Sequence, residues 1–596
     1  MDVPSTILYS SLLLYFFLHN PKVAADNTQG LNEWYPKIGT WEKSHKRYWY
    51  NVRENPTGLP QGMENWSKKE LDAELPVSLM TEFWPYLLPP AKFAIHKIDS
   101  KYLGLIGLVV DTMPWVDEND ILAITRKFKA QLFYPWHYKA NNGEVSIKHL
   151  TESDQEELLA RDIDKEHKPG LQFRAITSHN TVYKESTEFK KVHNLFKLGR
   201  RRTKLPKESP NSSSKQLHSR AFEGMQYEIE RIENAGYDQI SLSTPLGRTI
   251  ERQVNDFGTS AFRWKQGGIG VDVYVIDSGC DTRHPEFQDA YFKDWIYAGK
   301  NSLEEEGDDH FIIPGAAEEG EEEEEDILVH HGSAVIAKIV GKTVGVATGA
   351  QIIAVKAGRQ GDGFPQYTWL EAHLKVYDHI MDHLDSRRFY SYTDQERLQP
   401  CVIVSTVAIE TMDKRFTEYI LRKMIKGWAK MVCYFVVAAG NKLSTKKRRA
   451  LVDTFPGVLG ADKKLKNLVV VGGHDDDYQN VHQAADYVKI SALSVGVLTV
   501  RSVGMGLEPP DGDWNLAYEE VDGTSFSAPQ VAGILAILIQ QGNIGQGHPD
   551  PLERLYKLRR KHVSKDGDPK PAYNGIRQLQ WPGALEAPRR GALDHF

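Results

Sequence analysis

Residues 522–533 read Asp-Gly-Thr-Ser-Phe-Ser-Ala-Pro-Gln-Val-Ala-Gly, and they form the most specific motif in this chain of 596 residues. The small residues before Ser525 allow another backbone to approach, and the apolar residues after it indicate a helix. Pro529 fits the first turn of that helix, where a missing N–H is tolerated. Backbone N–H groups and the helix dipole favour negative charge at such a start. Ser525 is therefore either a helix cap or a nucleophile whose attack leaves an oxyanion.

Around this motif, from about residue 270 to 542, short apolar runs alternate with amphipathic patterns. The apolar runs lie at 271–276, 351–355, 402–407, 432–439 and 468–471, and the amphipathic patterns lie at 371–387 and 413–430. Strands that are apolar at consecutive positions indicate a parallel sheet covered by helices on both faces. We predict an α/β domain with a doubly wound, mainly parallel sheet, whose sites lie beyond the carboxyl ends of the strands.

Three weaker motifs adjoin these runs. Asp277 follows the first run in Val-Ile-Asp-Ser-Gly, His331 precedes a helical pattern in His-His-Gly-Ser-Ala, and Asn441 follows Ala-Ala-Gly. Each has an ordinary explanation, because Asp is common at strand ends, adjacent histidines diverge in direction, and Asn after Gly is a frequent turn. In this fold class such residues gather at one edge of the sheet. We predict a single site there, in which a carboxylate orients an imidazole and an amide faces a developing oxyanion.

In this order, the four motifs resemble those of the subtilisin-like serine peptidases, the subtilases, over roughly residues 245–545. The resemblance implies that Ser525 is the nucleophile, that His331 is the general base and then acid, and that Asp277 orients and stabilises the imidazole. Asn441 and the backbone N–H of Ser525 would form the oxyanion hole. The implied activity is that of a secreted serine endopeptidase that cleaves peptides or proteins through an acyl-enzyme.

Two departures from the family pattern concern packing and substrate. Ile336 and Ala337 follow the histidine where the family has smaller residues. The substrate-lining Ser-Leu-Gly strand of the family aligns with Thr406, Val407 and Ala408, which we expect to bind substrate. The methyl group of Ala408 would narrow the first specificity pocket. These changes keep an alternative open, a subtilase-fold protein with weak or no activity that binds a peptide or a partner protein.

A third departure is an acidic insert at 304–326, between the aspartate and histidine motifs. A block of like charges repels itself and stays solvated. The insert lacks the alternating ligands and turn glycine of a calcium loop, so we expect a surface loop rather than a metal site. We predict no cofactor and no metal at the active site, and leave a structural calcium ion open.

The first residues resemble a secretory signal. Residues 7–18 are an apolar run shorter than the roughly 20 residues that a membrane span needs, and 23–25 supply small residues for cleavage. Because Asp2 is the one charge before this run, a buried N-terminal helix is the alternative. No other stretch is apolar enough to span a bilayer, so we predict a secreted protein with no membrane association after signal cleavage.

Changes in composition, charge and apolar pattern along the chain indicate six segments. They are a signal peptide at 1–25, an N-terminal pro-region or accessory domain of α+β type at 26–196, a basic and Ser-rich linker at 197–216, a lead-in segment at 217–247, the catalytic domain at 248–545, and a C-terminal extension at 546–596. In the N-terminal segment we predict strands at 92–97 and 103–111 and a helix at 120–133. In the lead-in segment we predict a helix at 221–234 and a strand at 239–242.

The N-terminal segment has two interpretations. Subtilases are commonly made with a propeptide that assists folding and occupies the active site until it is cut away, so the resemblance implies that the pro-region inhibits its own enzyme. Arg200, Arg201 and Arg202 in the linker fit a processing site for a protease specific for basic residues. Tryptophans are frequent between 26 and 145; we expect them in a core, with a glycan-binding module as the alternative.

Charge and cysteine content narrow the class further. A net charge of −7 argues against nucleic acid as a partner, and we expect a monomer. Three cysteines are too few for a disulfide scaffold or a four-cysteine zinc site. Cys401 and Cys433 begin neighbouring strands, where a cross-link would strain disulfide geometry, so we expect buried free thiols there. We expect Cys280 to be a packing residue.

Overall fold

The structure is a computed structural model that describes residues 46–51, 95–112, 135–141, 144–148, 172–173, 228–245, 248–282, 284–298, 326–357, 366–390, 396–409, 414–444, 449–500, 518–544, 550–561, 563–564 and 567–576. Contacts divide the chain into two compact units. One comprises Met1–Lys97, Gly107–Ala140 and Ile147–Pro169, and the other Ile98–Ile106, Asn141–Ser146 and Gly170–Phe596. Within the described ranges, no helix combines the length and the apolar character that crossing a membrane requires.

The N-terminal strands form a six-stranded sheet in the order β2-β3-β1-β4-β5-β6. They are β1 (Lys46–Asn51), β2 (Ile95–Ser100), β3 (Gly104–Thr112), β4 (Pro135–Asn141), β5 (Glu144–Lys148) and β6 (Gln172–Phe173). β1 is antiparallel to both β3 and β4. The strands predicted at 92–97 and 103–111 are confirmed to within a few residues. The predicted signal peptide, the helix at 120–133 and the linker at 197–216 lie outside the described residues.

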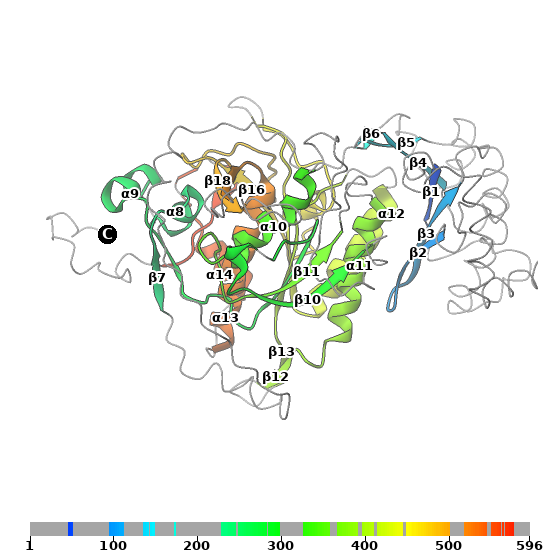
Figure 1. Cartoon of the computed structure of the whole chain (residues 1–596), viewed down its shortest axis with the longest axis horizontal. Helices are drawn as coiled ribbons and strands as arrows, with labels where there is room; N and C mark the ends of the chain where they lie inside the picture. The colour runs from blue at the N-terminus through cyan, green and yellow to red at the C-terminus, as the bar shows by residue number, and fades with distance from the viewer. Residues whose placement is uncertain are drawn as a thin grey trace, which may run out of the picture. The chain divides into compact units, whose positions relative to one another are not determined.

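The second unit is built on an eight-stranded sheet in the order β10-β11-β9-β14-β15-β16-β17-β20 (Figure 1). Its strands are β9 (Asp272–Asp277), β10 (Tyr291–Tyr297), β11 (Gln351–Lys356), β14 (Cys401–Ser405), β15 (Cys433–Ala438), β16 (Leu468–His474), β17 (Ile490–Leu493) and β20 (Lys570–Pro571). Every neighbouring pair in this sheet is parallel. The predicted doubly wound, parallel α/β class is therefore confirmed.

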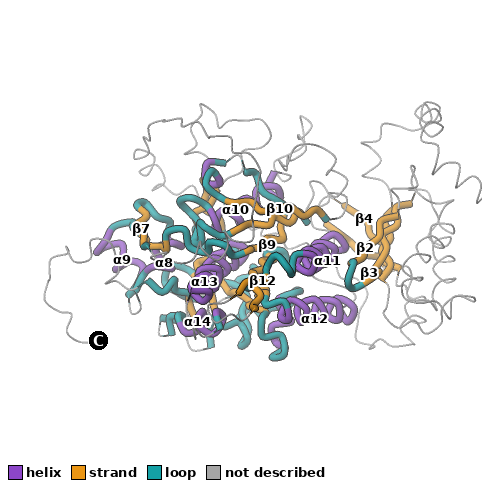
Figure 2. Tube along the Cα trace, turned by 90° about the horizontal axis from the view of Figure 1, so that it is seen from below, coloured by secondary structure: helices purple, strands orange, loops and turns teal. Residues whose placement is uncertain are grey.

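Helices cover both faces of this sheet. On one face lie α10 (Asp326–Val340) and α13 (Thr524–Ile544), whose apolar residues share one core with Val273 and Val275 of β9. On the other face lie α11 (Gln366–Asp382) and α12 (Lys414–Lys430), side by side in both views (Figures 1 and 2). Tyr274 points toward α11, where its ring centroid lies 5.5 Å from that of His379. The two faces follow from the alternation of side chains along a strand.

The strand order places β9 at the switch point of the sheet. β11 and β14 flank β9, and the connection from β9 to β11 contains α10 on one face whereas the connection from β11 to β14 contains α11 on the other face. Sites of doubly wound folds lie at such points. Asp277 is the last residue of β9, where it is fully buried.

The lead-in segment differs from its prediction. In its described part, residues 228–234, the helix predicted at 221–234 is wrong, and so is the strand predicted at 239–242, because the structure has β7 (Ile229–Ile232) and α8 (Tyr237–Ser243) there. β7 pairs antiparallel with β8 (Ala261–Trp264), a tertiary partner that overrides local propensity. α8 is nearly all buried, including polar residues such as Gln239 and Ser241, and its two apolar residues, Ile240 and Leu242, are spaced as in a strand, so a short window cannot distinguish it from strand alternation. The next helix is α9 (Ile250–Phe257).

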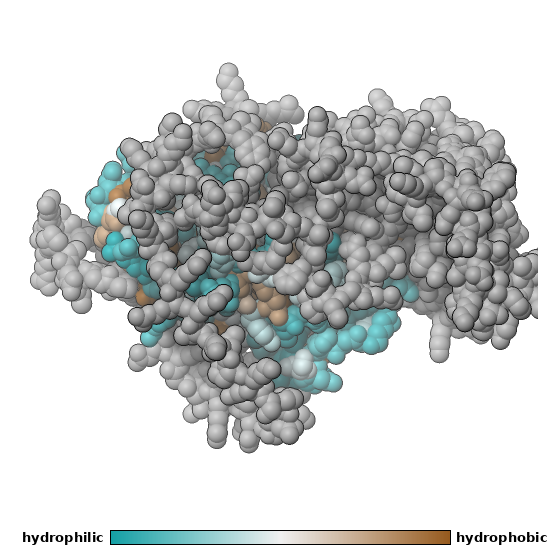
Figure 3. All heavy atoms as spheres, in the orientation of Figure 1, coloured by the Kyte–Doolittle hydropathy of each residue, from teal (hydrophilic) through white to brown (hydrophobic). Residues whose placement is uncertain are grey.

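The remaining elements are short. They are η4 (Pro285–Phe287), η6 (Gly457–Ala461), the antiparallel pairs β12 (Arg388–Tyr390) with β13 (Glu396–Leu398) and β18 (Val497–Val500) with β19 (Tyr518–Val521), and α14 (Pro551–Lys557). β20, which lies in the predicted C-terminal extension, pairs with β17 at the end of the main sheet. On the face drawn in Figure 3, the coloured surface is mostly hydrophilic with a small hydrophobic area near its centre.

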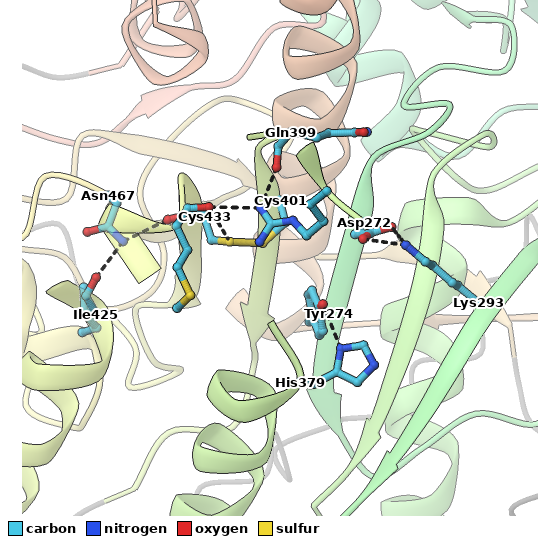
Figure 4. Close-up of a disulfide and its surroundings, with 11 residues drawn as sticks. Asp272, Tyr274, Lys293, His379, Gln399, Cys401, Ile425, Cys433 and Asn467 are labelled. Carbon is cyan, nitrogen blue, oxygen red and sulfur yellow. Dashed lines mark hydrogen bonds and ion pairs between the residues drawn. A yellow bond between two sulfur atoms is a disulfide. The ribbon is translucent and has the colours of Figure 1, made fainter. Parts of the chain in front are cut away.

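The cysteines give the second correction. Cys401 and Cys433 form a disulfide rather than the free thiols expected from the sequence (Figure 4). They are paired directly in the ladder between β14 and β15, with Cα atoms 4.5 Å apart, a separation that a disulfide can span. Cys280 is a free thiol packed in the main core, and burial raises its pKa well above the ordinary value.

Candidate active site

Asp277 and His331 form a buried carboxylate–imidazole pair at the end of β9. Nδ1 of His331 lies 2.8 Å from Oδ1 and 3.0 Å from Oδ2 of Asp277. Because a carboxylate can only accept, it holds the proton of the neutral imidazole on Nδ1 and leaves the lone pair on Nε2. Nε2 is buried and has no hydrogen-bond partner among the described residues. The pair therefore presents an oriented, unpaired base.

The carboxylate of Asp277 is held in its ionised form. The hydroxyl of Thr406 donates to Oδ2, and the backbone N–H of Ser278 donates to Oδ1 at 2.7 Å. Burial alone would raise the pKa of Asp277, but the nearby charge of His331 and the hydrogen bonds from His331, Thr406 and Ser278 hold this pKa below its usual value. Asp277 thus stays an acceptor for the Nδ1 proton.

A glycine allows the two motifs to meet. α10 begins at Asp326, so His331 lies in its second turn rather than at the helix start expected from the sequence. The next residue, Gly332, packs on the backbone of Gly279, and a Cβ atom at 332 would overlap the carbonyl oxygen of Gly279. The N–H of Gly332 also donates to the hydroxyl of Ser278 at 3.0 Å. Only glycine permits this approach of α10 to the end of β9.

Ser525 is buried in the first turn of α13, as predicted. The ring of the next residue, Phe526, lies 5.4 Å from the ring of His331, centroid to centroid. This contact places the first turn of α13 beside His331, and no hydrogen bond joins Ser525 to Nε2 in this structure. Pro529 lies in the second turn, one turn later than predicted, so the carbonyl of Ser525 lacks its ordinary helix donor.

Asn441 is fixed by the start of α13. Its Oδ1 accepts from both the N–H and the hydroxyl of Thr524, each at 2.8 Å. Because a backbone N–H can only donate, this contact identifies the oxygen of the amide and leaves the Nδ2 group as the free donor. Gly440, which has φ +108, gives its own N–H to the Thr524 hydroxyl at 3.1 Å. The structure thus brings Asn441 to the helix turn that carries Ser525.

The three residues predicted to bind substrate follow β14. The hydroxyl of Thr406 donates to Asp277, a contact that was not predicted from the sequence. A residue with a hydroxyl group directly after β14, the strand next to β9, could have indicated it. The carbonyl of Val407 accepts from the indole N–H of Trp369 at 3.1 Å, and Ala408 is buried.

A buried histidine next to Trp369 predicts that the stability of the fold decreases in acid. His373 is fully buried beside Trp369, donates to the Trp369 carbonyl at 2.7 Å, and has its pKa lowered to about 4 by burial. Because the folded pKa lies below the unfolded value of about 6.5, the stability gained from the neutral ring is complete above pH 6.5 and is lost as pH falls toward 4, by up to about 3 kcal/mol. His474, whose pKa burial also lowers to about 4, should act in the same direction.

Denaturant titrations at several pH values between 4 and 7.5 measure this loss. The slope of the free energy of unfolding against pH should be smaller in the variant His373→Leu than in the wild type. The difference in slope should correspond to about one bound proton. An unchanged slope in that variant would show that His373 does not titrate on unfolding.

Several predicted residues are outside the described part of the chain. Arg200, Arg201, Arg202 and nearly all of the acidic insert are among them, so the processing site and the solvated loop stay predictions. Ile336 and Ala337 are buried in the core that α10 shares with α13, so they fill a packed surface. Among the described residues, the one group suited to a metal ion lies apart from Asp277 and His331 and consists of Asp294, His379 and His383.

A doubly wound sheet with an Asp–His pair at its switch point, an amide and a helix-start serine defines a domain of the serine peptidase class. Comparison with known proteins agrees with this class, since residues 268–557 match the sequence model of the subtilase family. These residues are a subtilase-family domain. All four residues of the candidate site, Asp277, His331, Asn441 and Ser525, lie within the match.

Relatives are similar over about half of the chain. Subtilisin-like protease 2 of Arthroderma otae is 26% identical over 326 residues, which cover 53% of this chain and 61% of the relative. Subtilisin-like protease 2 of Trichophyton rubrum is 26% identical over 321 residues, which cover 52% of this chain and 61% of the relative. The chain thus matches less than two thirds of the length of these relatives. A crystal structure of a cold adapted subtilisin-like serine proteinase superimposes with a TM-score of 0.38 and 18% identity, over 58% of this chain and 100% of that one.

Proposed function

We propose that this chain is a serine endopeptidase that hydrolyses peptide bonds of proteins or peptides through an acyl-enzyme on Ser525. The observation that carries the proposal is the buried Asp277–His331 pair, which leaves Nε2 unpaired among the described residues and whose ring contacts Phe526, the residue after Ser525 in the first turn of α13. This arrangement supports proton removal from a serine hydroxyl, because the carboxylate fixes the tautomer that the base requires.

In the first half of the reaction, Oγ of Ser525 attacks the carbonyl carbon of the scissile bond and its proton moves to Nε2 of His331. The imidazolium is stabilised by Asp277, which stays ionised. The negative oxygen of the tetrahedral intermediate accepts from Nδ2 of Asn441 and from the backbone N–H of Ser525, a first-turn group with no intrahelical acceptor. Nε2 then gives its proton to the leaving amine as the C–N bond breaks.

In the second half, water attacks the acyl-enzyme while His331 accepts a proton from it. A second tetrahedral intermediate collapses, the acid product leaves, and Oγ of Ser525 regains its proton from Nε2. These steps use only side-chain and backbone groups of the chain, so we propose a mechanism without a cofactor. Thr406, Val407 and Ala408 are proposed to line the substrate site.

A fluorophosphonate probe tests this function directly, because it labels only an activated serine. The folded, processed wild type is expected to carry one label, and mass spectrometry should place it on the peptide that contains Ser525. Absence of labelling in such a preparation would reject the peptidase and favour the alternative, a protein of this fold that binds a peptide or a partner protein.

We further propose that the protein is secreted and is made as a zymogen, with residues 26–196 as a pro-region that inhibits the enzyme. The support is the signal-like sequence at 1–25 and the basic linker with Arg200, Arg201 and Arg202. N-terminal sequencing of the secreted protein should find a mature chain that begins near Thr203. A mature chain that still begins near Asp26 would reject processing at the linker. We expect the mature enzyme to be a monomer.

A further inference from the structure

Away from the candidate active site, three side chains with metal-binding chemistry come together on the α11 face of the sheet. Asp294 lies on the edge strand β10, His379 in the last turn of α11, and His383 four residues further along the chain. One carboxylate oxygen and one ring nitrogen from each histidine lie within 4.8 Å of one another. Two imidazoles and a carboxylate are a ligand set that suits Zn²⁺ and related divalent transition metals.

The hydrogen bonds of the cluster orient both histidines. Nδ1 of His383 lies 2.8 Å from the backbone carbonyl oxygen of His379, which can only accept, so the lone pair of the neutral ring is on Nε2. Nδ1 of His379 lies 3.0 Å from the hydroxyl of Tyr274, and Figure 4 shows the two side chains facing each other. Metal-binding histidines usually have such an outer partner on their second nitrogen.

The Tyr274 hydroxyl suits both states of His379, because it can donate or accept. With no ion, Nε2 of His379 keeps its proton toward Asp294 and Nδ1 accepts from Tyr274. With an ion on Nε2, the ring proton sits on Nδ1 and is donated to Tyr274. The outer contact is therefore kept in both states, and the ring of His379 does not have to move.

The carboxylate of Asp294 is oriented in the same way. Its Oδ1 accepts from the backbone N–H of Trp295 at 2.8 Å, which leaves Oδ2 facing Nε2 of His379 at 2.9 Å. A metal ion about 2.0–2.1 Å from both atoms, with a ligand–metal–ligand angle of roughly 90–110°, would hold them about 2.9–3.4 Å apart. The observed separation is at the lower limit of this range, so a small outward shift of the two atoms would admit a tetrahedral ion. His383 is exposed and stacks on His379 with ring centroids 4.1 Å apart, so a change of its side-chain torsions can supply the third ligand.

The neighbouring charges do not oppose a cation. The nearby Lys293 is bound to both carboxylate oxygens of Asp272, each at 2.8 Å. The cluster thus lies beside a neutralised ion pair.

We propose that Asp294, His379 and His383 bind one divalent transition-metal ion of the zinc type, which joins the edge strand β10 to the end of α11. The ion would brace the open edge of the sheet and, through Tyr274, the strand β9. Its binding does not depend on the proposed peptidase activity, because none of its ligands belongs to that site.

Zinc binding to the full chain tests the proposal, in the Ser525→Ala variant so that self-digestion plays no part. After removal of metals with EDTA and exchange of the buffer, calorimetry should find one equivalent of Zn²⁺. A free zinc concentration of about 100 Kd should raise Tm by roughly 3–8 °C. Titration with Co²⁺ should give the visible absorption of a nitrogen- and oxygen-bound ion.

Two substitutions and one control locate the ion. Adding His383→Ala or Asp294→Asn should weaken zinc binding at least tenfold and abolish the rise in Tm, while the Tm without metal should stay close to that of the parent. The control Asp385→Asn removes a carboxylate two residues from His383 that is 95% exposed and outside the cluster, and should bind zinc as the parent does. Unchanged zinc affinity in both ligand variants, or no uptake by the folded parent, would overturn the site.

Discussion

Replacing Ser525 with alanine is expected to lower kcat for a peptide substrate by about 10⁶-fold, the loss that follows when a triad serine is removed. Without Oγ there is no atom to form the acyl-enzyme, and His331 has no proton to accept from the chain. The remaining rate should come from substrate binding and the oxyanion hole alone. Initial rates with a fluorogenic peptide library, measured on processed protein, give the comparison.

Ser527 supplies the matched control. It lies two residues further along α13, is fully buried, and its hydroxyl donates to the carbonyl oxygens of Ala492 and Leu493, each at 3.1 Å. Ser527→Ala should reduce stability by about 1 kcal/mol through the lost hydrogen bonds and leave kcat within a few-fold of the wild type. The assignment of the nucleophile fails if Ser525→Ala keeps activity, or if the two variants lose activity alike.

Replacing Asp277 with asparagine is expected to lower kcat by about 10⁴-fold while the fold is kept. The N–H of Ser278 would hold the amide oxygen at the Oδ1 position, 2.8 Å from Nδ1 of His331, and the NH₂ group would take the Oδ2 position, 3.0 Å from Nδ1. A neutral amide no longer stabilises the imidazolium, and its NH₂ group, which can only donate, favours the ring tautomer with the proton on Nε2, the wrong one for a base. Peptide hydrolysis across the neutral pH range, with a thermal unfolding control, measures the effect.

Thr406→Val is the graded counterpart of this substitution. It removes one donor to Asp277 but leaves the carboxylate and its contact with His331, so we expect a loss of about 10–150-fold, as for one hydrogen bond to a charged group. A small effect of Asp277→Asn, no larger than that of Thr406→Val, would show that the carboxylate does not govern the tautomer of His331.

The positions of the site residues along the chain were predictable because elements of an α/β fold end in one place. Asp277 and Asn441 follow apolar runs, and parallel strands bring such ends to one edge of the sheet. Ser525 could be placed in the first turn of a helix because the small and apolar residues around it mark that start. The local sequence pattern predicted secondary structure less well where pairing with a distant strand determined it. The segment of β7, for example, was predicted as helix but pairs with β8 as a strand.

The sequence by itself determined the class of this domain, the order of its motifs and the residue types that its chemistry would need, since periodicity and motif spacing are local properties of a chain. Only the tertiary structure decided which distant groups meet. It paired Cys401 with Cys433 through the ladder register, and it placed the Thr406 hydroxyl on Asp277. It also brought His379 within reach of Asp294, 85 positions away. Such contacts depend on strand register and helix packing, which arise only when the whole core is assembled.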